Sequence, residues 1–153
     1  MSKMKYEVFH LHDFELQSGE ILPDAQLAYR TYGELDSEAG NTVLLPSFYT
    51  GDHVRNEGYF GAGRAIDPAR HFVVSVNLFG NGLSSSPSNT PAPFDAARFP
   101  RITFYDNVRA QYRLLTERLN TLSAERAQLA NKNMVVQSRV EAMITRLKGL
   151  EVS

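Results

Sequence analysis

Residues 71–77 read His-Phe-Val-Val-Ser-Val-Asn and residues 42–46 read Thr-Val-Leu-Leu-Pro, two short runs that are almost wholly apolar. Such runs are typical of strands that are buried on both faces of a parallel sheet. A short helix is expected between them, around Gly61–Ile66, and Asp67-Pro68 would end it because the residue before proline avoids helical backbone. Two strands joined by a helix-sized crossover form a βαβ unit, so the predicted fold class is α/β.

The residues before this unit predict a β-hairpin. Residues 6–16 are expected to form a strand that ends at Ser18-Gly19, and residues 25–32 (Ala-Gln-Leu-Ala-Tyr-Arg-Thr-Tyr) alternate apolar and polar side chains. Alternation of this kind is typical of a half-buried antiparallel strand. After the second apolar run, residues 80–100 are rich in Ser, Pro, Gly and Asn, and we expect a long loop there, of a length that is usually functional or disordered. Within this region, residues 77–89 are expected to be flexible and exposed.

The last third of the chain predicts a single long helix. Neither proline nor glycine occurs from Ile102 to Leu147. Thr103 and Asp106 have the spacing of a capping box, in which each residue satisfies a backbone N–H of the other. We therefore divide the chain into an α/β module over residues 1–102 and a helix over residues 103–151, which would be about 70 Å long at 1.5 Å per residue.

Apolar residues recur along this helix at alternating spacings of four and three, the pattern of a two-stranded or multi-stranded coiled coil. With Val108 assigned to heptad position d, Arg126 and Asn133 are the two polar exceptions, and both fall at position a. Of the five g-to-e pairs that a parallel pair would form, only Arg146–Glu151 joins opposite charges, so an antiparallel pair or a bundle stays open. These positions, called the heptad seam below, are Val108, Tyr112, Leu115, Leu119, Leu122, Arg126, Leu129, Asn133, Val136, Val140, Met143, Leu147 and Leu150, and the expected interface runs from Leu115 to Leu150.

Composition excludes several classes of protein. The chain has 153 residues, a formal net charge of −1 and no cysteine. Disulfide scaffolds, cysteine-ligated metal centres and thiol catalysis are therefore excluded. The small net charge argues against a nucleic-acid partner, and the lack of a long apolar run argues against a membrane partner. No signal-peptide pattern is present, so a cytoplasmic protein is expected. No cofactor is expected either. The seam predicts a homo-oligomer or another protein partner.

Six segments of the first two thirds of the chain share a pattern with one known family: 14–20 (FELQSGE), 29–33 (YRTYG), 49–51 (YTG), 72–77 (FVVSVN), 80–89 (GNGLSSSPSN) and 106–111 (DNVRAQ). Through them, residues 14–117 resemble the N-terminal part of the homoserine O-acetyltransferase family of α/β-hydrolase-fold proteins. This family transfers acyl groups or hydrolyses esters through a Ser-His-Asp triad, and the resemblance implies the same fold and chemistry here.

The resemblance implies two vestiges of an active site and no catalytic residue. The oxyanion loop would be Tyr49, Thr50 and Gly51, and the active-site entrance loop would include Asn77, Gly80, Asn81, Gly82 and Ser84. A G-x-S-x-G elbow must present the nucleophile, yet the nearest approach to it is Gly82-Leu-Ser84-Ser-Ser86. The α/β part is thus expected to be a truncated hydrolase half without its serine elbow.

The four histidines suggest no catalytic or metal site. His10 and His12 would lie on one face of a strand, but no third ligand is placed near them, so we predict surface residues and no metal. His53 would lie near the active-site rim, although Asp52 beside it is not expected to pair with it because adjacent side chains point apart. His71 is expected to be structural.

Residues 118–151 are similar to small coiled-coil proteins of the ZapB type, which are associated with cell division. Segments 124–129, 132–133 and 138–148 carry this similarity. The chain therefore has the character of a fusion of two unlike parts, and the junction between them lies near residues 115–119. The leading hypothesis is a catalytically incomplete module, not an enzyme, that acts by binding or oligomerisation; the alternatives are an acyltransferase or esterase completed by a partner chain, and a partly folded module with an open strand edge.

Overall fold

The computed structural model describes the backbone of residues 6–151 and the side chains of residues 6–147. Two compact units divide the chain, Met1–Glu117 and Arg118–Ser153. The first unit holds a sheet and the first turns of the one α-helix among the described residues, and the second holds the rest of that helix. Each unit is described by itself below.

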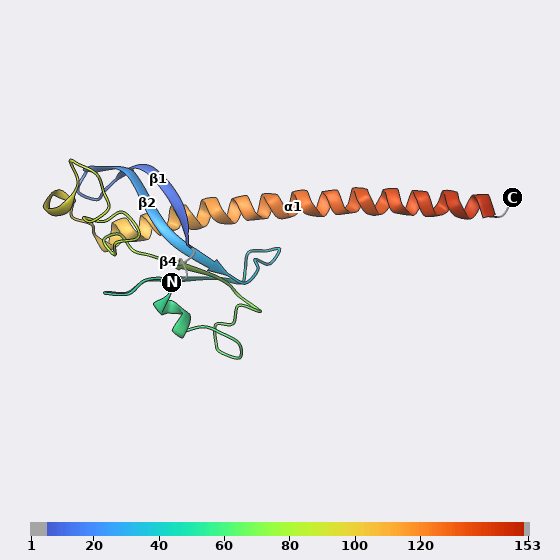
Figure 1. Ribbon diagram of the computed structural model, residues 1–153, viewed down its shortest axis with the longest axis horizontal. Helices are drawn as coiled ribbons and strands as arrows, with labels where there is room; N and C mark the ends of the chain where they lie inside the picture. The colour runs from blue at the N-terminus through green and yellow to red at the C-terminus, as the bar shows by residue number, and fades with distance from the viewer. Residues whose placement is uncertain (1–5, 152–153) are drawn as a thin grey trace. The chain divides into compact units, whose positions relative to one another are not determined.

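The sheet of the first unit has four strands in the order β1-β2-β4-β3 (Figure 1). Antiparallel pairs join β1 (Glu7–Glu15) to β2 (Ile21–Tyr32), and β2 to β4 (Phe72–Val76), whereas β3 (Thr42–Pro46) is parallel to β4. The predicted hairpin and the predicted parallel pair are both confirmed. The sheet is mixed because β4 pairs antiparallel with β2 on one side and parallel with β3 on the other.

The two parallel strands differ in burial, and the prediction that both are covered on two faces is wrong for β3. Every residue of β4 is buried, but the first four residues of β3 are half-buried and its last residue, Pro46, is exposed. The reason lies in strand order: β4 has a neighbour on each side, while β3 is the edge strand. Among the described residues, no strand pairs with its outer edge.

The crossover from β3 to β4 contains no α-helix. The helix predicted around Gly61–Ile66 is absent, and the crossover holds only a 3₁₀ helix over Arg55–Gly58. Gly63 has a φ of 74°, in the left-handed region, and the N–H of Gly61 is bonded back to the carbonyl of Ile66 at 2.9 Å. A backbone that closes on itself in this way forms turns, because right-handed helical φ values are lost.

Helix α1 runs over Phe104–Glu151 and begins at the predicted capping box. The Asp106 N–H donates to the Thr103 hydroxyl at 3.2 Å, and the Asp106 carboxylate accepts from the Thr103 N–H at 2.8 Å. The capping box and the single long helix are therefore confirmed. No helix in the described part of the chain has an apolar stretch long enough to cross a membrane.

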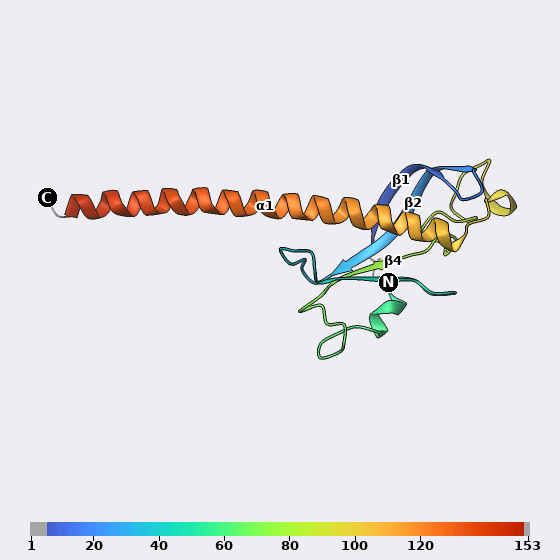
Figure 2. The same ribbon diagram turned by 180° about the vertical axis from the view of Figure 1, so that it is seen from behind.

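Within the first unit, one face of α1 packs on the sheet and the heptad seam lies on another. Ala110 and Leu114 are fully buried, whereas the seam residues Val108 and Tyr112 are 61% and 69% exposed. Both views show the first turns of α1 beside β1 and β2 (Figures 1 and 2). Arg109 and Arg113 fix this arrangement by donating to the carbonyls of Glu15 and Leu11 at 3.0 and 3.3 Å.

The carboxylate of Asp106 joins the segment after β1 to the start of α1 at this contact. It is fully buried and accepts hydrogen bonds from the Gln17 N–H at 2.7 Å and from the N–H and hydroxyl of Thr103 at 2.8 and 2.7 Å. Burial alone would raise the pKa of Asp106, but the bonds from Thr103 and Gln17 outweigh it and hold the pKa below the ordinary 3.8. The charged form is therefore the one that stabilises the fold.

Replacing this carboxylate should destabilise the first unit. We expect Asp106→Asn to lower the free energy of unfolding by about 2 kcal/mol, because an amide presents its N–H₂ to one of the three donors. Urea denaturation followed by tyrosine fluorescence measures the change, with Glu141→Gln on the exposed part of α1 as the control. Because the folded-state pKa is depressed, the native protein should lose this stability as the pH falls below about 4, and the Asn variant should lack that loss. Equal acid sensitivity in both proteins would contradict the assignment.

Candidate functional site

A cavity of about 860 Å³ lies between the loop that follows β3 and the loop that follows β4. Both loops leave the carboxyl ends of parallel strands, the edge at which α/β sheets usually bind ligands. The predicted oxyanion loop and part of the predicted entrance loop therefore meet at one site. The lining residues are Ser47, Phe48, Tyr49, Thr50, Gly51, Asp52, Arg55, Leu78, Phe79, Gly80, Asn81, Gly82, Leu83 and Phe104.

Hydrogen bonds hold the first loop against the second. The Ser47 N–H donates to the carbonyl of Val76 at 2.7 Å, and the Ser47 hydroxyl accepts from the Leu78 N–H at 3.0 Å. A tight turn follows, in which the Gly51 N–H donates to the Phe48 carbonyl at 2.9 Å while Thr50 adopts a φ of 64°. Left-handed backbone at a residue other than glycine is strained, and such strain gathers at functional sites.

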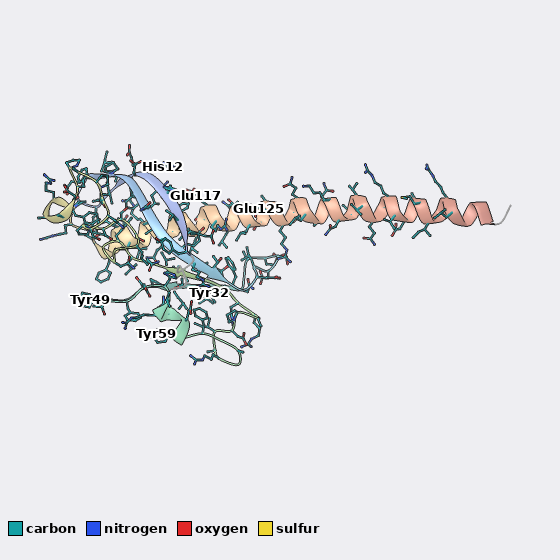
Figure 3. All side chains as sticks on the ribbon, viewed as in Figure 1. His12, Tyr32, Tyr49, Tyr59, Glu117 and Glu125 are labelled. Carbon is teal, nitrogen blue, oxygen red and sulfur yellow. The ribbon has the colours of Figure 1, made fainter. Side chains whose placement is uncertain are left out.

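Aromatic side chains surround the mouth of the cavity. Tyr49 is 92% exposed and extends away from the ribbon, and Phe104 at the start of α1 is also exposed (Figure 3). The rings of Phe48 and Tyr59 contact each other edge to face, with centroids 6.4 Å apart. The walls are mainly apolar with a few polar groups, a composition that suits a small organic ligand.

Asn77 does not line the cavity but lies fully buried beneath it. Its side-chain oxygen accepts from the His53 N–H at 3.0 Å and from the Asn81 amide at 2.9 Å. Its side-chain amide donates to the carbonyl of Ala28 at 2.9 Å. One amide thus connects β2 to both loops of the site.

Ser84 also lies beneath the cavity, and its hydroxyl has a structural geometry. The hydroxyl accepts from the Ala28 N–H at 2.9 Å and donates to the Asn77 carbonyl at 2.7 Å. Its proton is therefore held by a backbone carbonyl, and no histidine contacts it among the described residues. A nucleophilic serine needs a base in that position.

The prediction of a flexible, exposed loop over Asn77–Asn89 is wrong for its serine run. Ser84, Ser85 and Ser86 are all buried. Ser85 accepts from the Gln26 N–H at 2.9 Å, and Ser86 accepts from the Gly82 N–H at 2.8 Å. The hydroxyls of Ser84 and Ser85 take the place of a strand partner for the β2 backbone, and Ser86 bonds within its own loop, which explains why so polar a segment is internal.

His53 and Asp52 take separate places. The His53 side chain is fully buried, away from the rim where it was predicted, and its ring meets the ring of Tyr6 edge-on at 5.8 Å. Asp52 lines the cavity, but its carboxylate accepts from the N–H groups of Val54 and Arg55, each at 3.1 Å. The carboxylate therefore orders the turn after the predicted oxyanion loop and forms no dyad with His53.

The other histidines lie outside the site. His10 and His12 are exposed with ring centroids 6.4 Å apart, and the described residues contain no group of three side chains that could hold a metal ion. A bulge separates the two residues in β1, where the register with β2 shifts. His71 accepts from the Asp67 N–H at 3.1 Å and so helps to form the turn before β4.

Two residues that the sequence did not single out anchor the crossover. Asn56 is buried in the 3₁₀ helix and donates to the Leu45 carbonyl and the Ser75 hydroxyl, both at 3.0 Å. Glu57 accepts from the Tyr32 hydroxyl at 2.7 Å and from Arg30 at 3.2 Å. Burial, and then the bond to Glu57, raise the pKa of Tyr32 above its ordinary value. Only long-range contacts reveal these roles, because neither residue stands in a recognisable motif.

The described lining lacks most of the groups that acyl transfer needs. Acyl transfer requires a nucleophile within hydrogen-bond reach of a base, together with N–H donors for the oxyanion. The described lining includes the backbone of the predicted oxyanion loop but no histidine, and the Ser47 hydroxyl is already bonded to Leu78. No G-x-S-x-G occurs in the 153 residues.

The curated proteins that are similar to this chain include two kinds of enzyme. No family model matches the chain. An ethyl acetate hydrolase from Pseudomonas veronii is 37% identical over 113 residues, which are 73% of this chain and 32% of the hydrolase. A homoserine O-acetyltransferase from Thermobifida fusca is 39% identical over 118 residues, covering 67% of this chain and 31% of the transferase.

Solved structures agree with these relatives. An acetylester hydrolase from Corynebacterium glutamicum superimposes with a TM-score of 0.71 at 38% identity, over 74% of this chain and 33% of the hydrolase. The acetyl esterase MekB gives a TM-score of 0.74 at 36% identity, over 76% and 34% of the two chains. The chain spans about a third of the length of the relatives it matches. Its N-terminal part thus resembles the esterases and homoserine O-acetyltransferases of the α/β-hydrolase fold.

Proposed function

We propose that this chain is an esterase-like or acyltransferase-like module without catalytic activity of its own, which acts by associating through the heptad seam of α1. The exposed seam is the observation that carries the proposal. Its large apolar residues in the second unit, Leu129, Val136, Val140, Met143 and Leu147, are all exposed. Burial of one such side chain contributes roughly 1.5–3 kcal/mol, so a partner that covers all of them gains considerable stability.

The seam has the character of an interface along most of its length. Leu115, Leu119 and Leu122 are half-buried, Arg126 and Asn133 are exposed, and the side chain of Leu150 lies outside the described residues. A solvent-facing helix with no partner is usually polar all round, whereas this one keeps a regular apolar stripe. The similarity of residues 118–151 to ZapB-type proteins supports a coiled coil made of copies of this chain, in a cytoplasmic assembly of the cell-division type.

The site geometry supports the absence of activity. The Ser84 hydroxyl is bonded to backbone on both sides, and His53 is buried away from the cavity. A hydrogen-bond donor loop without a nucleophile stabilises no tetrahedral intermediate. The cavity would then bind a small ligand without turning it over.

One observation favours a second candidate, an esterase or acyltransferase completed by a partner chain. The outer edge of β3 pairs with no described strand, and the cavity opens at the carboxyl end of that strand. An exposed edge of this kind accepts a further strand from another chain. The partner would have to supply a serine elbow and a histidine.

Association should depend on the seam and not on exposed apolar area in general. Val136 and Val135 are neighbours, 59% and 46% exposed, but Val136 lies on the seam and Val135 lies beside it. We expect Val136→Glu to raise the dissociation constant at least about tenfold, because a carboxylate would be buried against the partner. Val135→Glu carries the same charge change and should leave it unaltered.

Light scattering on a size-exclusion column, over a range of protein concentrations, measures both variants beside the native chain. A native chain that stays monomeric at every concentration would contradict self-association. Equal effects of the two variants would show that the seam is not the interface.

Two activity assays and a substitution of Ser84 test the absence of activity. We expect no hydrolysis of p-nitrophenyl acetate above background and no labelling by a fluorophosphonate probe. Ser84→Ala should instead lower the free energy of unfolding by about 1–3 kcal/mol, because it leaves the Ala28 N–H and the Asn77 carbonyl without their partner. Ser88→Ala, at an exposed position of the same loop, is the control. Probe labelling that is lost on mutation of a single serine would overturn the inactive assignment.

A further inference from the structure

We propose that two copies of this chain pair through the heptad seam as a parallel, in-register, two-stranded coiled coil. This inference rests on the proposed self-association and adds its orientation and register. Three features of the sequence on the exposed helix point the same way. They concern the rows of residues that flank the seam, the charged residue within it and the amide within it.

The rows that flank the seam disfavour an antiparallel pair. In an antiparallel pair the g row of one helix faces the g row of the other, and four of its five residues between Arg118 and Arg146 are basic. In a parallel pair the g row faces the e row, which carries no charge over residues 116–144. The g row is Arg118, Glu125, Lys132, Arg139 and Arg146, and the e row is Thr116, Ser123, Ala130, Gln137 and Ile144.

The exceptional g residue stands next to the exceptional a residue. Glu125 is the one acid of the g row, and Arg126 is the one charged residue of the seam. In a parallel, in-register pair, an a side chain packs beside the g residue that precedes the equivalent a position of the partner. Each Arg126 therefore meets the Glu125 of the other copy, and these two contacts offset the repulsion between the two arginines. Figure 3 marks Glu125 on α1.

Asn133 favours the same arrangement. An a residue meets its own copy in a parallel, in-register pair, and two amides can donate to and accept from each other. In an antiparallel pair an a residue faces a d residue, and every d residue from Val108 to Met143 is apolar. That arrangement would bury the amide of Asn133 and the guanidinium of Arg126 against groups that cannot bond them, which is costly.

Cysteine cross-linking tests the orientation directly, because the chain contains no cysteine of its own. The variants are Leu122→Cys and Met143→Cys, both at d positions, and the control is Ser138→Cys on the outer face of the helix. In a parallel, in-register pair each d position lies next to its own copy, so both variants should form disulfide-linked dimers. Linking should be about a hundredfold faster than for the control, because pairing holds two thiols at a d position within reach of each other, whereas position 138 faces away from the partner and can link only between dimers.

The two d positions are about 31 Å apart along the helix, so an antiparallel pair could bring at most one of them next to its own copy. Linking at only one position, or at neither, in a sample whose mass by light scattering is that of a dimer would overturn the parallel orientation alone. A monomeric mass would overturn the proposed self-association itself. Circular dichroism of each variant verifies that α1 keeps its helix content.

Discussion

The buried carboxylate of Asp106 is the interaction on which the arrangement of the first unit depends. It accepts from Gln17 after β1 and from Thr103 at the start of α1, so it fixes where the helix begins and how the helix is rotated about its axis. Ala110 and Leu114 follow at spacings of four and eight and therefore lie on the same face, against the sheet. Val108 and Tyr112 consequently face away from the sheet, and the apolar seam starts within the first unit.

A second polar centre organises the cavity. The Asn77 amide and the Ser84 hydroxyl both bond to the backbone of Ala28 on β2, and through them the loops after β3 and β4 are tied to the middle of the sheet. Buried polar networks of this kind favour a single arrangement of loops, because a shift would leave further buried groups unpaired. The cavity is therefore preformed by side chains that do not line it.

Local sequence patterns predicted where strands and helices lie better than they predicted which residues are buried. The bounds of β3 and the capping box of Thr103 and Asp106 followed from residues close in sequence, and the structure agrees with both. The burial of Ser84 could not be predicted, because its partner Ala28 is 56 residues away and a Ser-rich run does not by itself indicate burial. The half-exposure of β3 likewise depends on strand order, and the turns at Gly61–Ile66 depend on a backbone bond that composition does not encode. Of the candidate site, Tyr49, Thr50 and Gly51 line the cavity and their role as an oxyanion loop stays a prediction, whereas Asn56 and Glu57 were missed because their partners are distant in the sequence.

The exposed part of α1 also determines how the chain folds. A helix without a core of its own is only marginally stable in water, so residues 118–147 would gain most of their stability from a partner that covers the seam. The first unit has its own buried sheet, and its folding would not depend on that partner. In a self-associating chain, the unfolding transitions of the two units would then depend differently on protein concentration. The midpoint for the second unit would rise with protein concentration, while that for the sheet would not, and a single melting temperature would describe neither.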